Sequence, residues 1–383
     1  METPVAARRY DIDWLRVFAT YVLFAFHTAK VFDVPPYYPI KNAHLSTRLG
    51  YFTGFVHQWH MPLFFLLAGW AAFGSLRQRG TTGFLRERLR KLLVPFVAGC
   101  VLLCPILKYL ELLAGAPILP DGRIGTGVAF HERFVDFLPT FFTRLDRFSW
   151  SHLWFLIYLF TFTLLYLPLF RRLSARATAN PRVSVPMVYL PIVPLVLIQT
   201  TLRWRWPGVQ NLYDDWGNFS YYSLYFILGF TLAWVPTFES ALHREWRRAG
   251  VIGVVALVLM IPDLGPLPNR ALSGVAGWCC VVALLGLAAA SLNFSNRALR
   301  YLSESAFPVY ILHQVGVVVV GYVVIQSAAG IGAKSLLVLV GSVAATLATY
   351  HFVVRPVGVL RLLFGMKPVE RLPARVADSV SLA

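Results

Sequence analysis

Ionisable side chains recur along the first apolar segment of the chain, from Asp13 through Arg16 to His27. On an α-helix, at about 100° per residue, Asp13, Arg16, Thr20, His27 and Lys30 fall on one face. Lipid excludes such a stripe, so we expect it to face the protein interior or a wet cavity, where ionisable residues are functional candidates. An imidazole has an ordinary pKa near 6.5 and can take a proton from a hydroxyl, which makes His27 a candidate general base. The alternative is a structural histidine bonded to a neighbouring helix.

Other polar residues stand at the ends of, or inside, later apolar runs. His57 and His60 are three residues apart, but no acidic third ligand stands at a helical offset, so we predict cavity-lining hydrogen bonds and no metal site. Trp154, near the start of the run 152–170, has a second interpretation, because tryptophan at the end of a membrane span is commonly an anchor at the membrane interface. The candidates for recognising a hydroxylated acceptor, or for lining its cavity, are His57, His60, His152, Trp154, Asp214, Asp215 and His313.

A basic run precedes the third apolar segment and contains Arg86, Arg88, Arg90 and Lys91. Guanidinium groups match phosphate oxygens well, so one interpretation is a clamp for a polyphosphate ligand such as coenzyme A. The other interpretation is flanking charge that holds this loop on the inner side of a membrane.

The composition excludes a soluble globular protein. Hydrophobic residues make up 57% of the 383 residues and charged residues only 14%, which predicts a polytopic, all-α membrane protein. About ten runs are long enough to span a membrane. They are residues 14–33, 52–76, 91–114, 152–170, 186–202, 218–237, 249–265, 272–291, 306–328 and 333–354. We interpret the first run as a retained helix, because it holds charged residues and lacks a small-residue cleavage site.

The distribution of Lys and Arg predicts the orientation. They are about twice as frequent in the loops that lie inside when the N-terminus is cytoplasmic, so we expect both termini to be cytoplasmic. The formal net charge of +17 is explained in the same way, and nucleic acid is not an expected partner. The predicted organisation is an integral-membrane domain over 1–355 and a basic cytoplasmic tail over 356–383. The connection 115–151 would be external, with an amphipathic aromatic segment at the interface.

Several of these pieces, in this order, resemble the acyltransferase-3 family of integral-membrane acyltransferases, and most closely its branch related to glucan-biosynthesis succinyltransferases. The arginine and histidine of the family's first motif correspond to Arg16 and His27. A second family motif, two arginines separated by two residues, is not met cleanly: this sequence has Arg88 and Lys91 at that spacing, so lysine replaces the second arginine. The matching text is Asp13-Trp14-Leu15-Arg16 with His27, His60-Met61-Pro62-Leu63-Phe64-Phe65, the basic run before Pro95, His152-Leu153-Trp154-Phe155-Leu156, Tyr310-Ile311-Leu312-His313, Lys41-Asn42 and Asp214-Asp215-Trp216.

The resemblance implies a multi-pass protein of the bacterial inner membrane that uses cytoplasmic acyl-CoA as co-substrate, with no tightly bound cofactor. A small acyl group, succinyl or acetyl, would pass to a hydroxyl of an extracytoplasmic carbohydrate or glycan. His27 would act as base, with Arg16 and Asp13 positioning the donor or the network of His27. A transporter of an anionic sugar or acylated metabolite is the competing hypothesis. Apart from the lipid bilayer and the two substrates no partner is predicted, and the sequence leaves open whether the chain forms a homo-oligomer.

Overall fold

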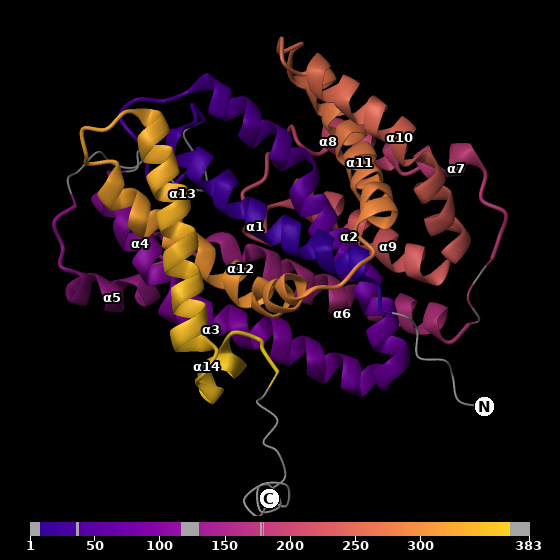
Figure 1. Cartoon of the computed structure of the whole chain (residues 1–383), viewed down its shortest axis with the longest axis horizontal. Coiled ribbons are helices and arrows are strands. Elements are labelled where there is room, and N and C mark those ends of the chain that lie inside the picture. The colour runs from indigo at the N-terminus through magenta and orange to yellow at the C-terminus, as the bar shows by residue number, and fades with distance from the viewer. Residues whose placement is uncertain (1–7, 36–37, 116–129, 177, 179, 368–383) are drawn as a thin grey trace, which may run out of the picture.

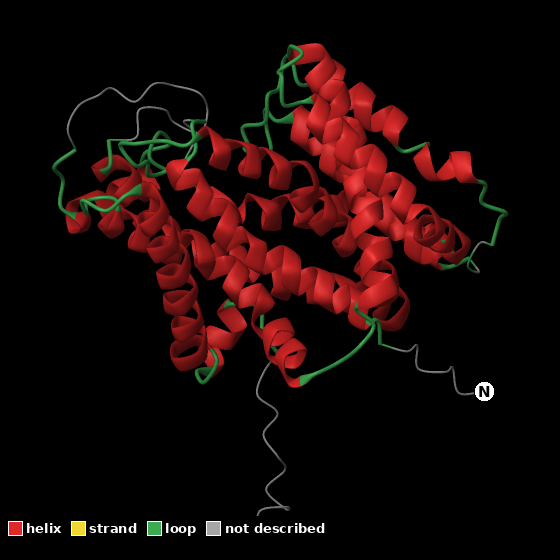
Figure 2. Cartoon of the chain, turned by 45° about the horizontal axis from the view of Figure 1, so that its top comes forward, coloured by secondary structure: helices red, strands yellow, loops and turns green. Residues whose placement is uncertain are grey.

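Helices make up most of the described chain (Figures 1 and 2). The structure is a computed structural model that describes residues 8–35, 38–115, 130–176, 178 and 180–367. No strand forms in these ranges, and a single bridge pairs Asp33 with Ser46. The α-helices are α1 (Tyr10–Phe32), α2 (Thr47–Arg88), α3 (Val94–Leu102), α4 (Cys104–Leu113), α5 (Phe134–Thr143), α6 (Trp154–Ser174), α7 (Val185–Tyr189), α8 (Ile192–Thr201), α9 (Trp216–Trp234), α10 (Pro236–Leu259), α11 (Pro266–Ser291), α12 (Arg297–Val324), α13 (Ile331–Ala348) and α14 (Gly358–Leu363). Short turns of other helical types are η1 (Leu89–Leu93), η2 (Ser151–Leu153) and η3 (Thr349–Val354).

The polytopic, all-helical prediction is confirmed. Within the described ranges, six helical segments are long and apolar enough to cross a membrane, and α9 with α10 makes a seventh if that pair, bent by 108°, counts as one span. All ten predicted runs overlap helices, but 186–202 is divided between the short helices α7 and α8. The six segments are Tyr10–Phe32, Thr47–Leu113, Ser151–Ser174, Pro266–Ser291, Arg297–Val324 and Ile331–Val354.

Helix α1 lies in the middle of the molecule, where it contacts α2 and α12 along its length and α11 and α13 in part (Figure 1). Its apolar side chains Leu15, Leu23 and Phe24 are buried against these neighbours. Most of the predicted polar stripe is also covered, as the cost of exposing it to lipid requires: Asp13 and Thr20 are buried, and His27 and Lys30 are partly buried. Arg16 is the exception and is exposed.

Helices α2 and α9 approach each other closely at two glycines. A Cβ atom on Gly69 would lie 1.9 Å from the carbonyl oxygen of Phe226, and a Cβ on Gly229 would lie 1.9 Å from that of Leu66. Small residues allow such close backbone contact between membrane helices, which gain little from hydrophobic association. Beside this crossing the ring of Phe65 stacks on Tyr222 with centroids 4.9 Å apart.

Helix α2 changes direction at Gly80, whose φ of +63° suits glycine because other L-residues rarely adopt it. The chain then continues through Arg88 into the π-helical turn η1 and α3. The basic run predicted as a loop is thus helical, and it lies between the kink and the next apolar helix.

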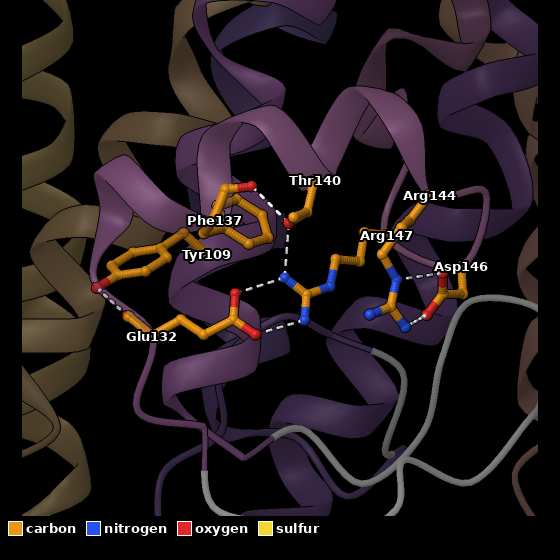
Figure 3. Close-up of polar contacts among 7 residues, drawn as sticks. All are labelled: Tyr109, Glu132, Phe137, Thr140, Arg144, Asp146 and Arg147. Carbon is orange, nitrogen blue, oxygen red and sulfur yellow. Dashed lines mark hydrogen bonds and ion pairs between the residues drawn. The ribbon is translucent and has the colours of Figure 1, made fainter.

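The connection before α6 is ordered by an arginine (Figure 3). Arg147 donates two hydrogen bonds of 2.6 Å to the carboxylate of Glu132 and one of 2.6 Å to Thr140 Oγ1. Tyr109 of α4 donates to the Glu132 carbonyl at 3.0 Å. The hydrogen bond from Arg147 holds the pKa of the Glu132 carboxyl below its ordinary value. Phe137 of α5 is fully buried, which agrees with the predicted partly buried aromatic segment; residues 116–129 lie outside the described ranges.

The predicted boundary at residue 355 falls between η3 and α14. Within the predicted tail, Arg361 of α14 lies near Glu304 of α12, with nitrogen and oxygen 3.6 Å apart. The remainder of the tail, 368–383, lies outside the described residues.

Candidate active site

Three histidines from separate parts of the chain meet beside α1. The ring centroid of His27 lies 5.1 Å from that of His313 on α12, which lies 5.2 Å from that of His152 on η2. His313 is fully buried and His152 nearly so, whereas His27 is partly exposed. In the sequence these residues belong to three separate apolar runs, and the packing of α1, α12 and η2 brings them into one cluster.

Backbone carbonyls determine the proton positions on two of these rings. His313 Nδ1 lies 2.5 Å from the carbonyl oxygen of Tyr310, and His152 Nε2 lies 2.8 Å from that of Ile311. Because a carbonyl oxygen can only accept, each of these nitrogens carries the hydrogen. His313 Nε2 and His152 Nδ1 are therefore lone-pair acceptors, and both are buried without a partner.

The backbone around His152 is held in an unusual conformation. Ser151 has φ of +46°, which is uncommon for a residue other than glycine. Its hydroxyl accepts a hydrogen bond of 3.2 Å from Gln314 of α12, and Tyr310 of α12 donates one of 2.7 Å to the carbonyl of His152. Strain of this kind persists where surrounding contacts determine it, and it is concentrated at functional sites.

The ring of His27 packs against aromatic rings but is not held by a hydrogen bond at Nδ1. Its Nδ1 is buried without a hydrogen-bond partner, and its ring contacts those of Phe26 and Tyr38 at centroid distances of 5.1 and 5.6 Å. The hydroxyl of Tyr38 is also buried without a partner. Buried polar atoms are nearly always satisfied, so these free atoms make His27 and Tyr38 candidates for contact with a polar ligand.

The predicted pair of Asp13 and Arg16 forms at the other end of α1. Asp13 is buried and accepts a hydrogen bond from Arg16 and one of 2.8 Å from Arg8. The Arg16 side chain is 51% exposed. At a rise of about 1.5 Å per residue, Arg16 stands roughly 16 Å along the helix from His27, so it does not share the histidine cluster.

His57 and His60 point to different neighbours of α2. His60 Nε2 lies 3.0 Å from the carbonyl oxygen of Ala19, which joins α2 to α1, and its ring stacks on Phe26. His57 instead lines a cavity between α2, α8, α9 and α11.

The residues of the basic run differ in their accessibility. Arg86 and Arg90 are exposed, and neither has an ion-pair partner among the described residues. Arg88 packs its guanidinium over Phe84 at 4.8 Å. Lys91 forms an ion pair of 2.8 Å with Glu87. Two of the four predicted donor-binding residues are thus free to contact a solvent-borne anion.

Trp154 is the first residue of α6, and Asp214 and Asp215 directly precede α9. Asp215 is unexposed; it caps α9 and accepts from Tyr158 Oη at 2.6 Å and Gln210 N at 2.9 Å. Asp214 accepts from the indole of Trp206 at 2.7 Å. The indole ring of Trp154 packs against Tyr222, 5.5 Å between centroids. Acceptor binding by these residues stays a prediction.

Sequence reasoning missed a buried ionic cluster close to His27. Asp33 is unexposed and pairs with Lys30 at 3.1 Å and Lys41 at 2.6 Å, and Thr53 donates to it at 2.8 Å. Lys30 is therefore engaged by Asp33, although it shares the helix face of His27. The signal was present in the sequence as an acidic residue three positions after Lys30.

The cluster can take and return a proton but is not arranged as a metal site. Within the described ranges, no group of three or more His, Cys, Asp or Glu side chains could hold a metal ion. The four cysteines are free thiols. Three imidazoles with unpartnered nitrogens, set among aromatic rings, instead suit proton transfer to or from a hydroxyl.

The chain is similar to known proteins over most of its length. A family model described as an acyltransferase domain, that of the acyltransferase-3 family, matches residues 9–351. Glucans biosynthesis protein C from Escherichia coli strain SMS-3-5 is 21% identical, with 97% of this chain and 100% of the relative covered. The protein of the same name from strain K12 / DH10B matches with the same identity and coverage. No solved structure matches.

Proposed function

Because this chain belongs to the acyltransferase-3 family, we propose that it moves a small acyl group, succinyl or acetyl, from acyl-CoA to a hydroxyl of a carbohydrate or glycan. The family makes the chain a membrane acyltransferase. The relatives named glucans biosynthesis protein C support a glucan as the acceptor. The observation that carries the chemistry is His27, whose buried Nδ1 has no partner and whose ring meets those of two other histidines.

The proposed reaction is direct transfer with His27 as general base. The acceptor oxygen attacks the thioester carbonyl while its proton moves to a ring nitrogen of His27. The tetrahedral intermediate collapses, the carbon–sulfur bond breaks, and the proton passes from the imidazolium to the leaving thiolate. The products are an ester and free CoA thiol. No covalent acyl-enzyme is needed, because positioning both substrates at the base supplies much of the rate.

The lone pairs of His313 and His152 support this role. His313 Nε2 and His152 Nδ1 are free hydrogen-bond acceptors, because backbone carbonyls hold the protons on the opposite ring nitrogens. An acceptor hydroxyl or an imidazolium at His27 can donate to them. They would thus orient the hydroxyl and stabilise the positive charge that develops on His27 in the transition state.

The donor would enter from the cytoplasm. We propose ten membrane crossings with both termini cytoplasmic in the bacterial inner membrane, an arrangement supported by the excess of Lys and Arg on that side. Arg86 and Arg90 would contact the phosphates of acyl-CoA, and Arg16 would guide the pantetheine arm toward His27. The separation of roughly 16 Å between Arg16 and His27 along α1 suits an extended arm.

Sealed vesicles of known orientation test the proposal. Acyl-CoA supplied on the cytoplasmic face, with an impermeant glucan on the other face, should yield free CoA thiol and a glucan whose mass rises by one acyl group. A transporter of an anionic sugar would release no thiol. Turnover with both substrates confined to one face would contradict transfer across the membrane.

A further inference from the structure

A polar cavity separate from the histidine cluster opens between α2, α8, α9 and α11. Its volume is about 220 Å³. None of its lining residues belongs to the cluster of His27, His152 and His313. The residues that matter for its chemistry are His57, Gln58, Gln199, Arg203, Arg270 and Ser273.

The cavity carries two guanidinium groups without a counter-charge. Arg270 packs over the ring of Trp204 at 4.1 Å, and its Nη1 is buried without a partner. Arg203 donates to Gln199 Oε1 at 2.8 Å and to the Pro207 carbonyl at 2.9 Å, both neutral groups. No carboxylate lines the cavity, and neither arginine forms an ion pair with any described residue.

The carboxylates of the adjoining loop are already used. Asp215 caps α9 and accepts from Tyr158 and a loop amide. Asp214 is exposed and accepts from the indole of Trp206 at 2.7 Å. Arg203 and Arg270 line one cavity without a carboxylate, so their positive charges repel each other. An anionic ligand bound between them would offset this repulsion and the cost of desolvating the two guanidiniums.

The loop that carries Arg203 is built around its guanidinium. Gly208 has φ of +114°, and a Cβ there would lie 2.5 Å from Arg203 Nη1. Gln210 and Leu212 also adopt positive φ, at 62° and 66°. Trp150 donates to the Gln210 carbonyl at 2.8 Å and so helps to hold this backbone. Strain that surrounding contacts maintain is a sign of a preorganised site.

The neutral polar groups of the cavity bond mainly to one another. Ser273 Oγ donates to Gln58 Oε1 at 2.5 Å and accepts from Gln199 Nε2 at 3.2 Å. Apart from the exposed ring of His57, the free groups are the hydrogens of the guanidiniums, which donate and cannot accept. A ligand must supply acceptors, and two arginines match the oxygens of a phosphate or carboxylate best.

From this arrangement we propose that the cavity binds an oxyanion, a phosphate or carboxylate, carried by the acceptor. A volume of about 220 Å³ is below the roughly 300–1,000 Å³ of sites that enclose a whole small molecule. It suits a charged group with a few attached atoms, while the rest of the ligand stays outside. As an acceptor subsite this inference rests on the proposed function, whereas binding of the oxyanion does not.

Binding to the full-length protein in nanodiscs of neutral phospholipid, without acyl donor, tests the proposal. Calorimetric titration with glucose 6-phosphate should show saturable binding, and titration with glucose should show none. Arg270→Gln should weaken the phosphate binding about 10- to 100-fold, since hydrogen bonds to charged groups are among the strong ones. Arg205→Gln is the matched control: it removes an exposed arginine of the same loop that does not line the cavity, and should change the affinity less than twofold.

Arg203 needs a second variant because it also bonds to the loop. Arg203→Gln should weaken binding as Arg270→Gln does, and Arg203→Lys, which retains the charge, should restore part of the affinity. Equal binding of glucose and glucose 6-phosphate would overturn the proposal. So would an equal loss of affinity in Arg205→Gln, or no saturable binding of the phosphate by the wild-type protein.

The source of the oxyanion is decided by changing the lipid. If phosphatidylglycerol in the nanodisc competes with glucose 6-phosphate, the cavity binds a lipid headgroup; if it does not, the cavity binds a soluble acceptor. Either result supports the oxyanion site. A protein that binds glucose 6-phosphate through Arg270 but releases no thiol from acyl-CoA would contradict the proposed function and leave this site standing.

Discussion

Replacing His27 by alanine should abolish acyl transfer while the protein stays folded. Loss of a general base lowers a rate by about 100- to 10,000-fold, which corresponds to roughly 2.7 to 5.4 kcal/mol of transition-state stabilisation at about 1.36 kcal/mol per tenfold. The loss of folding stability should be much smaller. His27 Nδ1 has no hydrogen-bond partner to lose, and the ring is partly exposed, so removing its contacts should cost on the order of 1 to 2 kcal/mol.

The matched control is His351→Ala. This histidine also belongs to an apolar segment and lies outside the cluster, with Nδ1 3.4 Å from the Tyr301 hydroxyl. We expect His351→Ala to keep most of the activity. The assay follows release of CoA thiol by purified protein, with thermal unfolding measured on the same samples. If His27→Ala retains kcat/KM within threefold of wild type at normal expression, the general base lies elsewhere.

Two further predictions concern charges at the ends of the helices. The double variant Arg86→Gln with Arg90→Gln should raise the KM for acyl-CoA roughly tenfold by removing phosphate contacts. The control, Arg244→Gln with Arg247→Gln, should leave the KM unchanged; it removes two exposed arginines from the connection between the predicted runs 218–237 and 249–265, which is cytoplasmic if the N-terminus is. Equal effects of the two double variants would show that Arg86 and Arg90 act only as flanking charge. In the connection drawn in Figure 3, the arginine partner holds the pKa of Glu132 below the ordinary 4.5, so its stabilisation is complete above that value and is lost as the pH falls through the lower folded-state pKa. Backbone hydrogen exchange of this connection, corrected for intrinsic rates, should therefore become faster in the wild type when the pH falls below about 4.5. In Glu132→Gln the exchange should be faster than in the wild type at neutral pH. An unchanged exchange rate in that variant would show that the ion pair does not order the connection.

Local periodicity was enough to predict the polar face of α1. Asp13, Arg16 and His27 share that face because helix geometry depends only on sequence spacing. The pairing of Asp13 with Arg16 follows from the same spacing. The approximate positions of the apolar runs likewise follow from hydropathy, because every spanning backbone group must bond within its own helix. The number of ten crossings stays a prediction, since six or seven helical segments of the described ranges are long and apolar enough to span.

The histidine cluster could not be predicted in this way. His152, His313 and His27 are brought together by the packing of η2 and α12 on α1, and no local rule links residues so far apart in the chain. Which ring nitrogen carries the proton on His313 and on His152 depends on the carbonyls of Tyr310 and Ile311. A sequence does not reveal these contacts.

The arginine cavity was missed for a different reason. Arg203 and Arg270 looked like ordinary charges at the ends of apolar runs, and only the backbone of the intervening loop turns the first of them inward. That backbone uses positive φ at Gln210 and Leu212, residue types that do not signal a left-handed conformation. The kink at Gly80, by contrast, occurs at the residue type that favours it.

The crossing of α2 and α9 limits which substitutions the sequence can accept at Gly69 and Gly229 during evolution. An alanine at Gly69 or Gly229 would collide with a backbone carbonyl of the opposite helix, and no change of side chain on the partner can relieve a collision with its main chain. Neither glycine can therefore be exchanged first and compensated later, as residues in an ordinary core can be. Because α2 and α9 both line the arginine cavity, homologues that alter its side chains for a new substrate should still retain both glycines.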